Sequence, residues 1–316
     1  MESYDFAIIG AGGTGLAAAM YGARLGLKTI VFGSTHGSEA AVGGVITTTN
    51  LVENYPGFKS ISGFDLAKKI EEHAKEYKEV SIKNEKVIEV RKKGNLFILK
   101  TGKSEYSSRT ILFATGTKWK KLDVKGAKEF EGRGVNYCAL CDGPLYKGKI
   151  VAVVGGGDSA AKDALILAEH AKKVYIIYRG ENIKPEPINL QKIKANKKIE
   201  VVTKTNITEI KGNDSGVGEV ILDKLLNGKN KIELEGVFVA IGHEVLSELA
   251  DKSGVKLNSK KEIVINHATS ETNVLGIFAA GDVTDKHFKQ LITGVADGCT
   301  AAYSAFEFIK KENLVE

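Results

Sequence analysis

The chain has 316 residues, 43% of them hydrophobic and only 4 of them proline, so it is long enough for about two domains and gives no sign of disorder. Its net charge of +6 is spread over single lysines and short clusters, whereas a nucleic-acid binder usually carries one concentrated basic stripe. Three cysteines in so long a chain argue against a secreted disulfide scaffold, no apolar run is long enough to cross a bilayer, and no basic segment begins a signal peptide. We therefore expect a cytoplasmic protein that binds neither nucleic acid nor membrane.

The first predicted element is a short buried strand, Asp5–Ile9, followed at once by the glycine loop Gly10–Gly15. An apolar helix follows and ends near Gly26, and Lys28–Phe32 is the next predicted strand. Strand, G-x-G-x-x-G loop, helix and strand within about 30 residues form the dinucleotide fingerprint in the context that it requires. The helix N-terminus then offers free N–H groups and a partial positive charge to phosphates.

Each glycine of this loop has an expected role. Gly10 permits the tight turn, Gly12 lets the backbone approach a pyrophosphate, and Gly15 lets the helix pack on the strand. The second strand lacks the acid that usually holds a ribose hydroxyl, because Gly33-Ser34-Thr35 follows it and the nearest acid, Glu39, lies further along the loop. We expect the adenosine end to be held in another way.

Residues 43–57 contain a run rich in glycine and hydroxyl groups, Gly43–Thr49, and then Val52–Gly57 with a Pro-Gly turn. They are either an irregular loop or a wall against a polar ring system such as isoalloxazine. An amphipathic helix is predicted from residue 64 to about Tyr77. Short strands are predicted from Val80 to Phe113, and they lead to Ala114-Thr115-Gly116.

Residues 118–134 are polar, charged and punctuated by glycine, so they are the best candidate for a linker. After a cysteine segment, the strand Lys149–Val154 leads into Gly155–Ala160, a G-x-G-x-x-A loop that begins a helix. Val174–Ile177 is the predicted second strand of this unit, which makes a second complete dinucleotide fingerprint. Strand-like segments follow and end at Val237–Gly242, so the two halves share one plan, as an internal duplication of the fold predicts.

About 70 residues remain after Gly242, too few for a third domain. An apolar strand delivers Gly281-Asp282 to a helix that begins near Phe288, which suits a cofactor hydroxyl bound at the carboxyl edge of a sheet. This tail most simply completes the first domain. We predict an α/β protein with two Rossmann-like, three-layer ββα dinucleotide-binding domains, the second inserted into the first: residues 1–116 with 246–316, and residues 117–245.

Two cysteines separated by two residues, Cys138 and Cys141, lie just before the second fingerprint. Such a pair can close a small disulfide ring and exchange electrons, and its N-terminal thiol is often activated. Asp142 is a candidate proton shuttle, although Asp-Gly before Pro144 is also a good turn by itself. A zinc site needs two more ligands, which Cys299 and the scattered histidines do not offer, so we expect no metal and a packing role for Cys299.

Over essentially its whole length the chain resembles the low-molecular-weight thioredoxin reductases. Each matching motif is weak alone, but their order is specific. The motifs are Gly10–Gly15, Gly43–Thr49, Val52–Gly57, Ala114–Gly116, Cys138–Asp142, Gly155–Ala160, Ile241–His243 and Ala279–Val283. The resemblance implies that the first domain binds FAD, that the second binds NADPH or NADH and carries the redox pair, and that the enzyme is a homodimer.

By the same resemblance, electrons pass from the nicotinamide through FAD to the Cys138–Cys141 disulfide. Cys141 is then the sulfur nearer the flavin, Cys138 attacks a thioredoxin- or glutaredoxin-like protein, and Asp142 donates a proton. The two domains are expected to rotate about residues 118–134 and 242–246, so that nicotinamide and cysteines reach the flavin in turn.

The implied cofactor contacts are spread along the chain, with Asp282 at the ribityl chain and Asn54 and Gln290 by the flavin ring. The implied FAD residues are Gly10, Gly12, Gly13, Gly15, Gly44, Val45, Thr49, Asn54, Ala114, Gly116, Gly281, Asp282, Lys289 and Gln290. The implied NAD(P) residues are Gly155, Gly157, Asp158, Ser159, Arg179, Lys184 and Gly242.

The chain departs from the family where the 2′-phosphate of NADPH is usually clamped by a His-Arg-Arg run and a further Arg. Here Tyr178-Arg179-Gly180 and Lys184 stand in those places, which weakens the case for NADPH. Pro185 and Pro187 are expected to stiffen the same loop. NADH, reduced flavin or a deazaflavin are the alternative donors, and Val45 and Lys289 replace the usual Gln and Arg beside the flavin.

Two other functions remain open. The first is a related reductase that serves a peroxidase, although such enzymes often carry an extra N-terminal redox domain and this chain begins at the FAD strand. The second is a flavin-binding redox sensor without steady turnover. A ferredoxin–NADP reductase of similar fold would not need Cys138 and Cys141.

Overall fold

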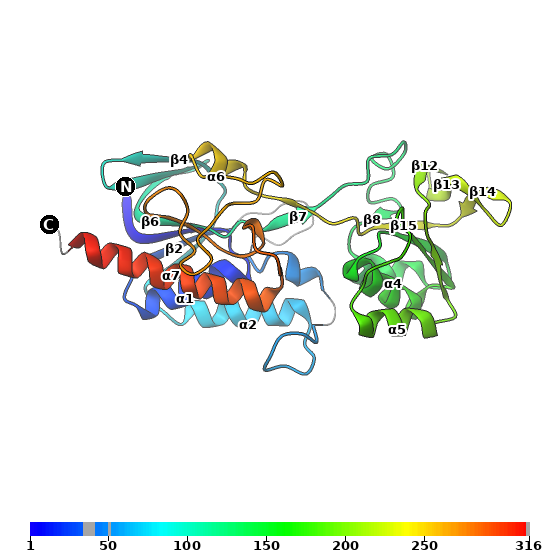
Figure 1. Cartoon of the computed structure of the whole chain (residues 1–316), viewed down its shortest axis with the longest axis horizontal. Helices are drawn as coiled ribbons and strands as arrows, with labels where there is room; N and C mark the ends of the chain where they lie inside the picture. The colour runs from blue at the N-terminus through cyan, green and yellow to red at the C-terminus, as the bar shows by residue number, and fades with distance from the viewer. Residues whose placement is uncertain (34–41, 50–51, 314–316) are drawn as a thin grey trace. The chain divides into compact units, whose positions relative to one another are not determined.

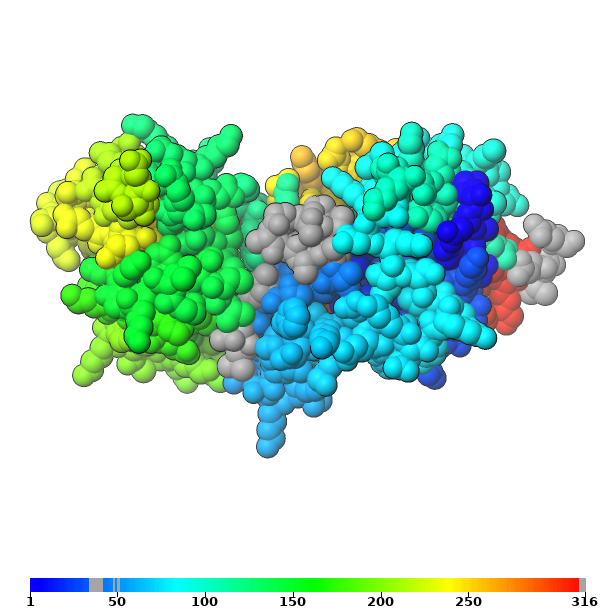
Figure 2. Space-filling view, turned by 180° about the vertical axis from the view of Figure 1, so that it is seen from behind, coloured from blue at the N-terminus to red at the C-terminus, as the bar shows by residue number. Residues whose placement is uncertain are grey.

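The computed structural model describes residues 1–33, 42–49 and 52–313, and the chain folds into two compact units. Unit 1 comprises Met1–Lys118 and Val245–Glu316, and unit 2 comprises Trp119–Glu244. The chain thus leaves unit 1 once and returns to it once, so unit 2 is an insertion (Figure 1). In a space-filling view, the green-to-yellow residues of unit 2 form one continuous body (Figure 2).

Unit 1 is built on a seven-stranded sheet in the order β3-β2-β1-β6-β5-β4, with β17 paired to β6. Strands β1, β2, β3, β6 and β17 run parallel, while β4 and β5 form an antiparallel hairpin that pairs with the start of β6. The bounds are β1 Glu2–Ile9, β2 Thr29–Gly33, β3 Val80–Asn84, β4 Val87–Lys93, β5 Leu96–Thr101, β6 Glu105–Phe113 and β17 Ile277–Ala279.

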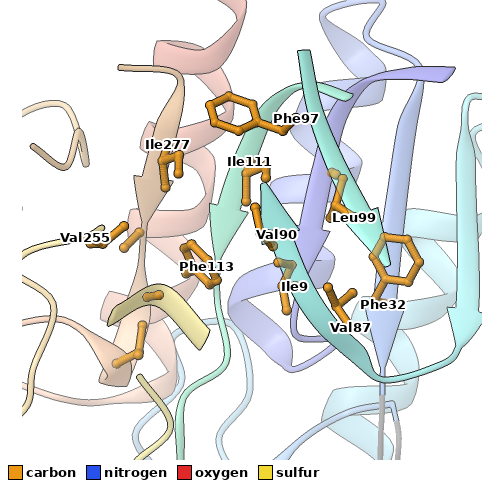
Figure 3. Packing of buried hydrophobic residues seen from close by; sticks show 14 of the residues in the cluster. Ile9, Phe32, Val87, Val90, Phe97, Leu99, Ile111, Phe113, Val255 and Ile277 are labelled. Carbon is orange, nitrogen blue, oxygen red and sulfur yellow. The ribbon is translucent and has the colours of Figure 1, made fainter. Parts of the chain in front are cut away.

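Strand β1 shows why unit 1 has layers on both sides of its sheet. Phe6 and Ile8 point to one face and join the cluster that packs under the helices, while Ala7 and Ile9 point to the other. That other cluster lies between the parallel strands and the β4–β5 hairpin, and Figure 3 shows Phe113 within it. Each buried Phe or Ile side chain in these clusters contributes roughly 1.5–3 kcal/mol. The apolar run Phe6–Ile9 at the end of β1 is therefore required for the three-layer unit.

Helices cover one face of this sheet: α1 (Gly13–Arg24), α2 (Gly63–Lys75) and α7 (Leu291–Asn313). Small residues allow α1 and α7 to pack closely, because a Cβ on Gly298 of α7 would overlap the carbonyl of Thr14 in α1. Helix α2 begins at a cap in which the Ser62 hydroxyl accepts a hydrogen bond from the Asp65 N–H at 3.0 Å. Among the described residues, none of the helices is long and apolar enough to span a membrane.

Unit 2 repeats this plan on a smaller scale. Its parallel sheet has the order β11-β10-β9-β15-β8, and a separate antiparallel sheet has the order β12-β13-β14. The bounds are β8 Val135–Asn136, β9 Ile150–Val154, β10 Lys173–Ile177, β11 Ile199–Val202, β12 Ile207–Asn213, β13 Gly216–Leu226, β14 Lys229–Glu233 and β15 Gly236–Val239. One apolar cluster lies between the two sheets. A second lies under helices α4 (Asp158–His170) and α5 (Pro187–Ala195). The predicted α/β fold with an inserted second domain is confirmed.

Two details differ from the sequence-based expectations. The sequence predicts a linker over residues 118–134, but Ala127 and Phe130 are buried in the core of unit 2, because their small and aromatic side chains fill the space between its sheets. The chain instead crosses between the units in two short strands that pair with each other, β7 (Thr117–Trp119) and β16 (His243–Val245). Pro187, expected to stiffen a loop, is the first residue of α5, where its missing N–H has no helical partner to lose.

Candidate active site

The first nucleotide loop joins β1 to α1, and its glycines differ in what surrounds them. A Cβ on Gly10, whose φ is +118°, would overlap the Ala114 carbonyl, and a Cβ on Gly15 would overlap the Gly10 carbonyl. A Cβ on Gly12 would meet nothing closer than 3.9 Å. The chain therefore closes over Gly10 and Gly15 and leaves the backbone open at Gly12, as a bound pyrophosphate requires.

Further predicted FAD residues line the same end of the sheet. The Gly43 N–H donates to the Ala11 carbonyl at 2.8 Å, which lays Gly43 and Gly44 along the loop ahead of a 3-10 turn, Val45–Thr48, and Thr49. Ala114 follows β6 and donates its N–H to the Ile9 carbonyl at 2.9 Å, with Gly116 two residues on. These segments surround the N-terminus of α1, where Gly13 is the first helical residue.

The chain's last segment brings Asp282 to this place. β17 leads into a short 3-10 turn, Gly281–Val283, and a Cβ on Gly281 would meet the Thr14 hydroxyl oxygen at 2.6 Å, so the turn lies directly against α1. Lys289 forms an ion pair with Glu262 at 2.5 Å and donates to the Asp282 carbonyl at 3.1 Å. Lys289 therefore holds the backbone of the turn that carries Asp282.

Two residues predicted beside the flavin ring are joined directly: the Asn54 amide donates to Gln290 Oε1 at 3.0 Å. They come from parts of unit 1 that are 236 residues apart. The glycine cradle, the helix N-terminus, the acid at the sheet edge and this amide pair fit a flavin dinucleotide. Ser34, Thr35 and Glu39, the part of the loop expected to lack a ribose acid, lie outside the described residues.

The second nucleotide loop, between β9 and α4, shows the same division of roles. A Cβ on Gly155, whose φ is +152°, would overlap the Ala240 carbonyl, whereas a Cβ on Gly157 would meet nothing within 4 Å. Asp158 and Ser159 form the first turn of α4. Gly242 follows β15 at the same edge of the sheet, and its carbonyl accepts a hydrogen bond from the Lys120 N–H at 3.0 Å.

Asp158 is already engaged within the chain. Its Oδ1 accepts hydrogen bonds from the Glu186 N–H and the Asn189 amide, each at 2.8 Å, and its Oδ2 pairs with Lys162 at 2.8 Å. Burial acts to raise the pKa of Asp158, but these partners outweigh it and hold the pKa below the ordinary value. The carboxylate therefore stays ionised at the start of α4 and fastens the loop before α5.

The loop after β10 lies close over this second nucleotide loop. The Tyr178 ring packs so near Gly156 that a Cβ there would meet ring atom Cγ at 2.5 Å, and it packs equally close to Gly180. The Lys184 N–H donates to the Gly156 carbonyl at 2.6 Å. Arg179 and Lys184 are exposed, so their side chains are accessible to an anionic ligand.

The redox pair lies at the start of α3 (Ala139–Asp142), where Cys138 and Cys141 form a disulfide with their α-carbons 5.4 Å apart. The Cys141 N–H donates to Cys138 Sγ at 3.1 Å. Cys138 is only 5% exposed, whereas Cys141 is exposed. Burial raises the pKa of Asp142, which favours its role as a proton donor.

A tyrosine that sequence reasoning did not single out anchors this segment. Tyr146 lies in the 3-10 turn Gly143–Tyr146, its hydroxyl accepts a hydrogen bond from the Asn136 amide at 2.8 Å, and its ring meets Phe238 edge-on at 5.3 Å. A buried aromatic with a polar partner is the signal that could have identified it. Within the described ranges, no three His, Cys, Asp or Glu side chains gather as metal ligands, and Cys299 is not disulfide-bonded.

Comparison with known proteins defines the class first. The family model for pyridine nucleotide-disulphide oxidoreductases matches residues 4–298, and the chain belongs to this family. It is 37% identical to a thioredoxin reductase of Bacillus subtilis (strain 168), with 98% of this chain and 95% of that protein covered.

Two solved structures resemble the chain in different ways. It is 36% identical to the thioredoxin reductase of T. acidophilum, with a TM-score of 0.89 and coverage of 97% of this chain and 99% of that one. It is 35% identical to a ferredoxin-flavin thioredoxin reductase from Clostridium acetobutylicum, with a TM-score of 0.52 and coverage of 98% and 99%. The resemblance to thioredoxin reductases is confirmed, and the protein is a flavoprotein disulfide reductase of a family that uses FAD and a nicotinamide dinucleotide.

Proposed function

We propose that this enzyme is a thioredoxin reductase that passes electrons from a reduced nicotinamide through FAD to the Cys138–Cys141 disulfide, and from there to thioredoxin or a thioredoxin- or glutaredoxin-like protein. The observation that carries the proposal is the disulfide itself, which lies in the same unit as a second open nucleotide loop. Similarity to thioredoxin reductases over nearly the full chain supports it.

The residues of unit 1 would hold FAD, which supplies two-electron chemistry between the nicotinamide and the disulfide. Gly12 and the α1 N-terminus would face the pyrophosphate, Asp282 would bind a hydroxyl of the ribityl chain, and Asn54 with Gln290 would border the ring. Lys289 acts on the cofactor through the backbone of Asp282, since its ammonium is already paired with Glu262.

The residues of unit 2 would carry out the exchange with the protein substrate. When the S–S bond breaks, the N–H of Cys141 stabilises negative charge on Cys138 Sγ, which favours Cys138 as the attacking thiolate. Burial raises the pKa of Asp142 above its ordinary value, which favours Asp142 as the proton donor to the thiolate that leaves. Because Cys138 is buried, its attack requires α3 to open locally after the disulfide has been reduced.

The donor is the least constrained part of the proposal. Arg179 and Lys184 offer two cations near a 2′-phosphate, but Gly180 offers none. We therefore propose NADPH or NADH as the donor. Reduced ferredoxin is the second candidate, because one similar structure is that of a ferredoxin-flavin thioredoxin reductase and because Asp158 places a negative charge where a pyrophosphate would bind.

The family resemblance also supports a homodimer in the cytoplasm. Light scattering of the FAD-loaded protein tests the first expectation: about twice the 34.0 kDa chain mass supports a dimer, and the chain mass itself contradicts it.

Turnover with a disulfide protein tests the proposed function and separates it from a sensor. The purified FAD-loaded enzyme is mixed with thioredoxin and with NADPH, NADH or reduced ferredoxin, and thioredoxin thiols are counted over time. Cys138→Ser and Cys141→Ser are expected to abolish thiol production, whereas the matched control Cys299→Ser retains it. Absence of thiol production with every donor would overturn the function.

A further inference from the structure

Asp163 is a partly buried acid that none of the steps above uses. It lies in the middle of α4 and keeps only a small accessible surface, and it forms no hydrogen bond or ion pair with another residue in the described part of the chain. Burial alone raises its pKa to about 7. An unpaired acid that is partly removed from water costs stability, so its presence calls for a functional explanation.

The packing of α3 against α4 places Asp163 beside the redox pair. Ala139, next to Cys138, shares an apolar cluster with Ala160, Ala164 and Leu167 of α4. At the other end of α3, a Cβ on Gly143 would lie 3.5–4.0 Å from Leu167, His170 and Ile166.

Helical spacing shows which face of α4 carries Asp163. Asp163 lies three, four and seven residues before Ile166, Leu167 and His170, which puts it on the same face of α4 and one turn nearer the N-terminus. The face that carries Asp163 is therefore the face that packs along α3, between its contacts at Ala139 and at Gly143. This spacing directs the Asp163 side chain toward α3, the helix that holds Cys141.

We propose that Asp163 is a positioning residue that couples proton uptake to reduction of the Cys138–Cys141 disulfide. Two electrons and one proton break the S–S bond and leave one thiol and one thiolate. The negative charge of the thiolate then favours the neutral form of Asp163, whose carboxylate takes one further proton from solvent. The proposal rests on the proposed function, since it requires this disulfide to be the redox-active pair.

Other titratable groups face the same region and must be distinguished from Asp163. Lys162 is paired with Asp158, and Tyr146 is hydrogen-bonded to Asn136. The remaining groups from the elements packed here are Asp142 and the two cysteines of the α3 segment, and His170 of α4. Burial raises the pKa of Asp142 as well, and it raises that of Asp163 to about 7, so the contribution of Asp163 should appear above about pH 7.

The test is a redox titration of the FAD-loaded protein in dithiothreitol buffers between about pH 6 and about pH 8.5. The redox state is read by alkylation and peptide mass, which separates the Cys138–Cys141 peptide from Cys299. At about pH 6 wild type and Asp163→Asn are expected to have equal reduction constants, because the carboxyl is neutral in both redox states. At about pH 8.5 the wild type is expected to be roughly fivefold to tenfold harder to reduce than Asp163→Asn, where tenfold corresponds to about 30 mV.

Two controls separate this role from a merely structural one. Asp163→Glu is expected to restore the pH-dependent difference, and Glu169→Gln, which removes an exposed carboxylate from the same helix, is expected to follow the wild type. Removing this unpaired, partly buried acid also raises the melting temperature above about pH 7, but that effect alone leaves the reduction constant of the disulfide unchanged. If Asp163→Asn does not give a folded flavoprotein, Asp163→Ser takes its place in the same titration.

The outcomes distinguish the two proposals. If the disulfide titrates reversibly but with the same pH dependence in wild type and in the uncharged variant, the coupling proposal is overturned and the reductase function stands. If the disulfide cannot be reduced reversibly in the wild type, both are overturned.

Discussion

The two nucleotide loops follow the same backbone plan but differ in what the chain places against them. In unit 1, two glycines are closed by neighbouring carbonyls, Gly12 is open, and no acid lies in the first turn of α1. In unit 2, Gly157 is equally open, but Asp158 begins α4 and the Tyr178 ring lies on Gly156.

This difference matches two modes of binding. A resident cofactor is held best by a preformed cradle with several walls, and unit 1 supplies Gly43–Gly44, the turn at Gly281 and the Asn54–Gln290 pair. A donor that binds and leaves in every turnover needs fewer such walls around it. A negative charge at the start of α4 also weakens the contacts of its pyrophosphate. We therefore expect tight FAD binding and weak donor binding.

The substitution with the largest expected effect disrupts the first nucleotide loop. Gly15→Val would force a side chain into the Gly10 carbonyl, so the variant is expected to lose FAD and with it almost all activity. Flavin absorbance of the purified protein, compared with the wild type, measures the loss. Full flavin occupancy in the variant would contradict the assigned role of Gly15.

The substitution with the next largest effect distinguishes the roles of the two nucleotide loops. Gly157→Val adds a side chain where the chain leaves open space, so folding and flavin content are expected to remain while the KM for the donor rises by about 10- to 100-fold. Steady-state kinetics with saturating thioredoxin measure it. An unchanged KM would show that the donor does not approach this loop.

A third change sharpens the choice between nicotinamides. Gly180→Arg alone is expected to change the preference between the two nicotinamides little. Its Cβ would collide with the Tyr178 ring, so the arginine could not be placed correctly for the 2′-phosphate. Combined with Tyr178→His, it is expected to raise the preference for NADPH over NADH by roughly tenfold, since a second guanidinium then reaches the 2′-phosphate. The measurement is the ratio of the kcat/KM values for the two donors. An unchanged ratio would show that the 2′-phosphate binds elsewhere.

The smallest expected effect concerns Asp158. Asp158→Asn keeps side-chain hydrogen bonding to the loop before α5 but removes a charge from the start of α4, so the donor KM is expected to fall about twofold to fivefold at low salt. This improvement in the donor KM should diminish as the salt concentration rises. A gain that is independent of salt would point to a loop movement rather than to charge.

Much of this arrangement follows from local sequence. The G-x-G-x-x-G spacing predicts which glycines must be closed and which must be open, because the turn, the phosphate approach and the helix packing each depend on neighbouring residues. The disulfide between Cys138 and Cys141 is likewise confirmed, since two intervening residues bring the thiols within reach.

The parts that could not be predicted depend on contacts made far along the chain. The burial of Phe130 depends on strands that come some 80 residues later, so its polar surroundings in sequence suggested a linker. The pairing of Asp158 with Asn189 depends on α5, which begins at a proline that looked like part of a loop. The pairing of Lys289 with Glu262 is likewise a tertiary contact that the local pattern around Lys289 does not encode.

Anaerobic reduction tests the central claim most directly, because it follows electrons from donor to disulfide in one sample. The FAD-loaded enzyme is mixed with one equivalent of NADPH or NADH, the flavin absorbance is followed, and the thiols of Cys138 and Cys141 are then counted by alkylation. We predict that at least one nicotinamide reduces the flavin, that the flavin reoxidises without oxygen, and that the Cys138–Cys141 pair becomes a dithiol. Reduction of the flavin with the disulfide left intact would contradict it.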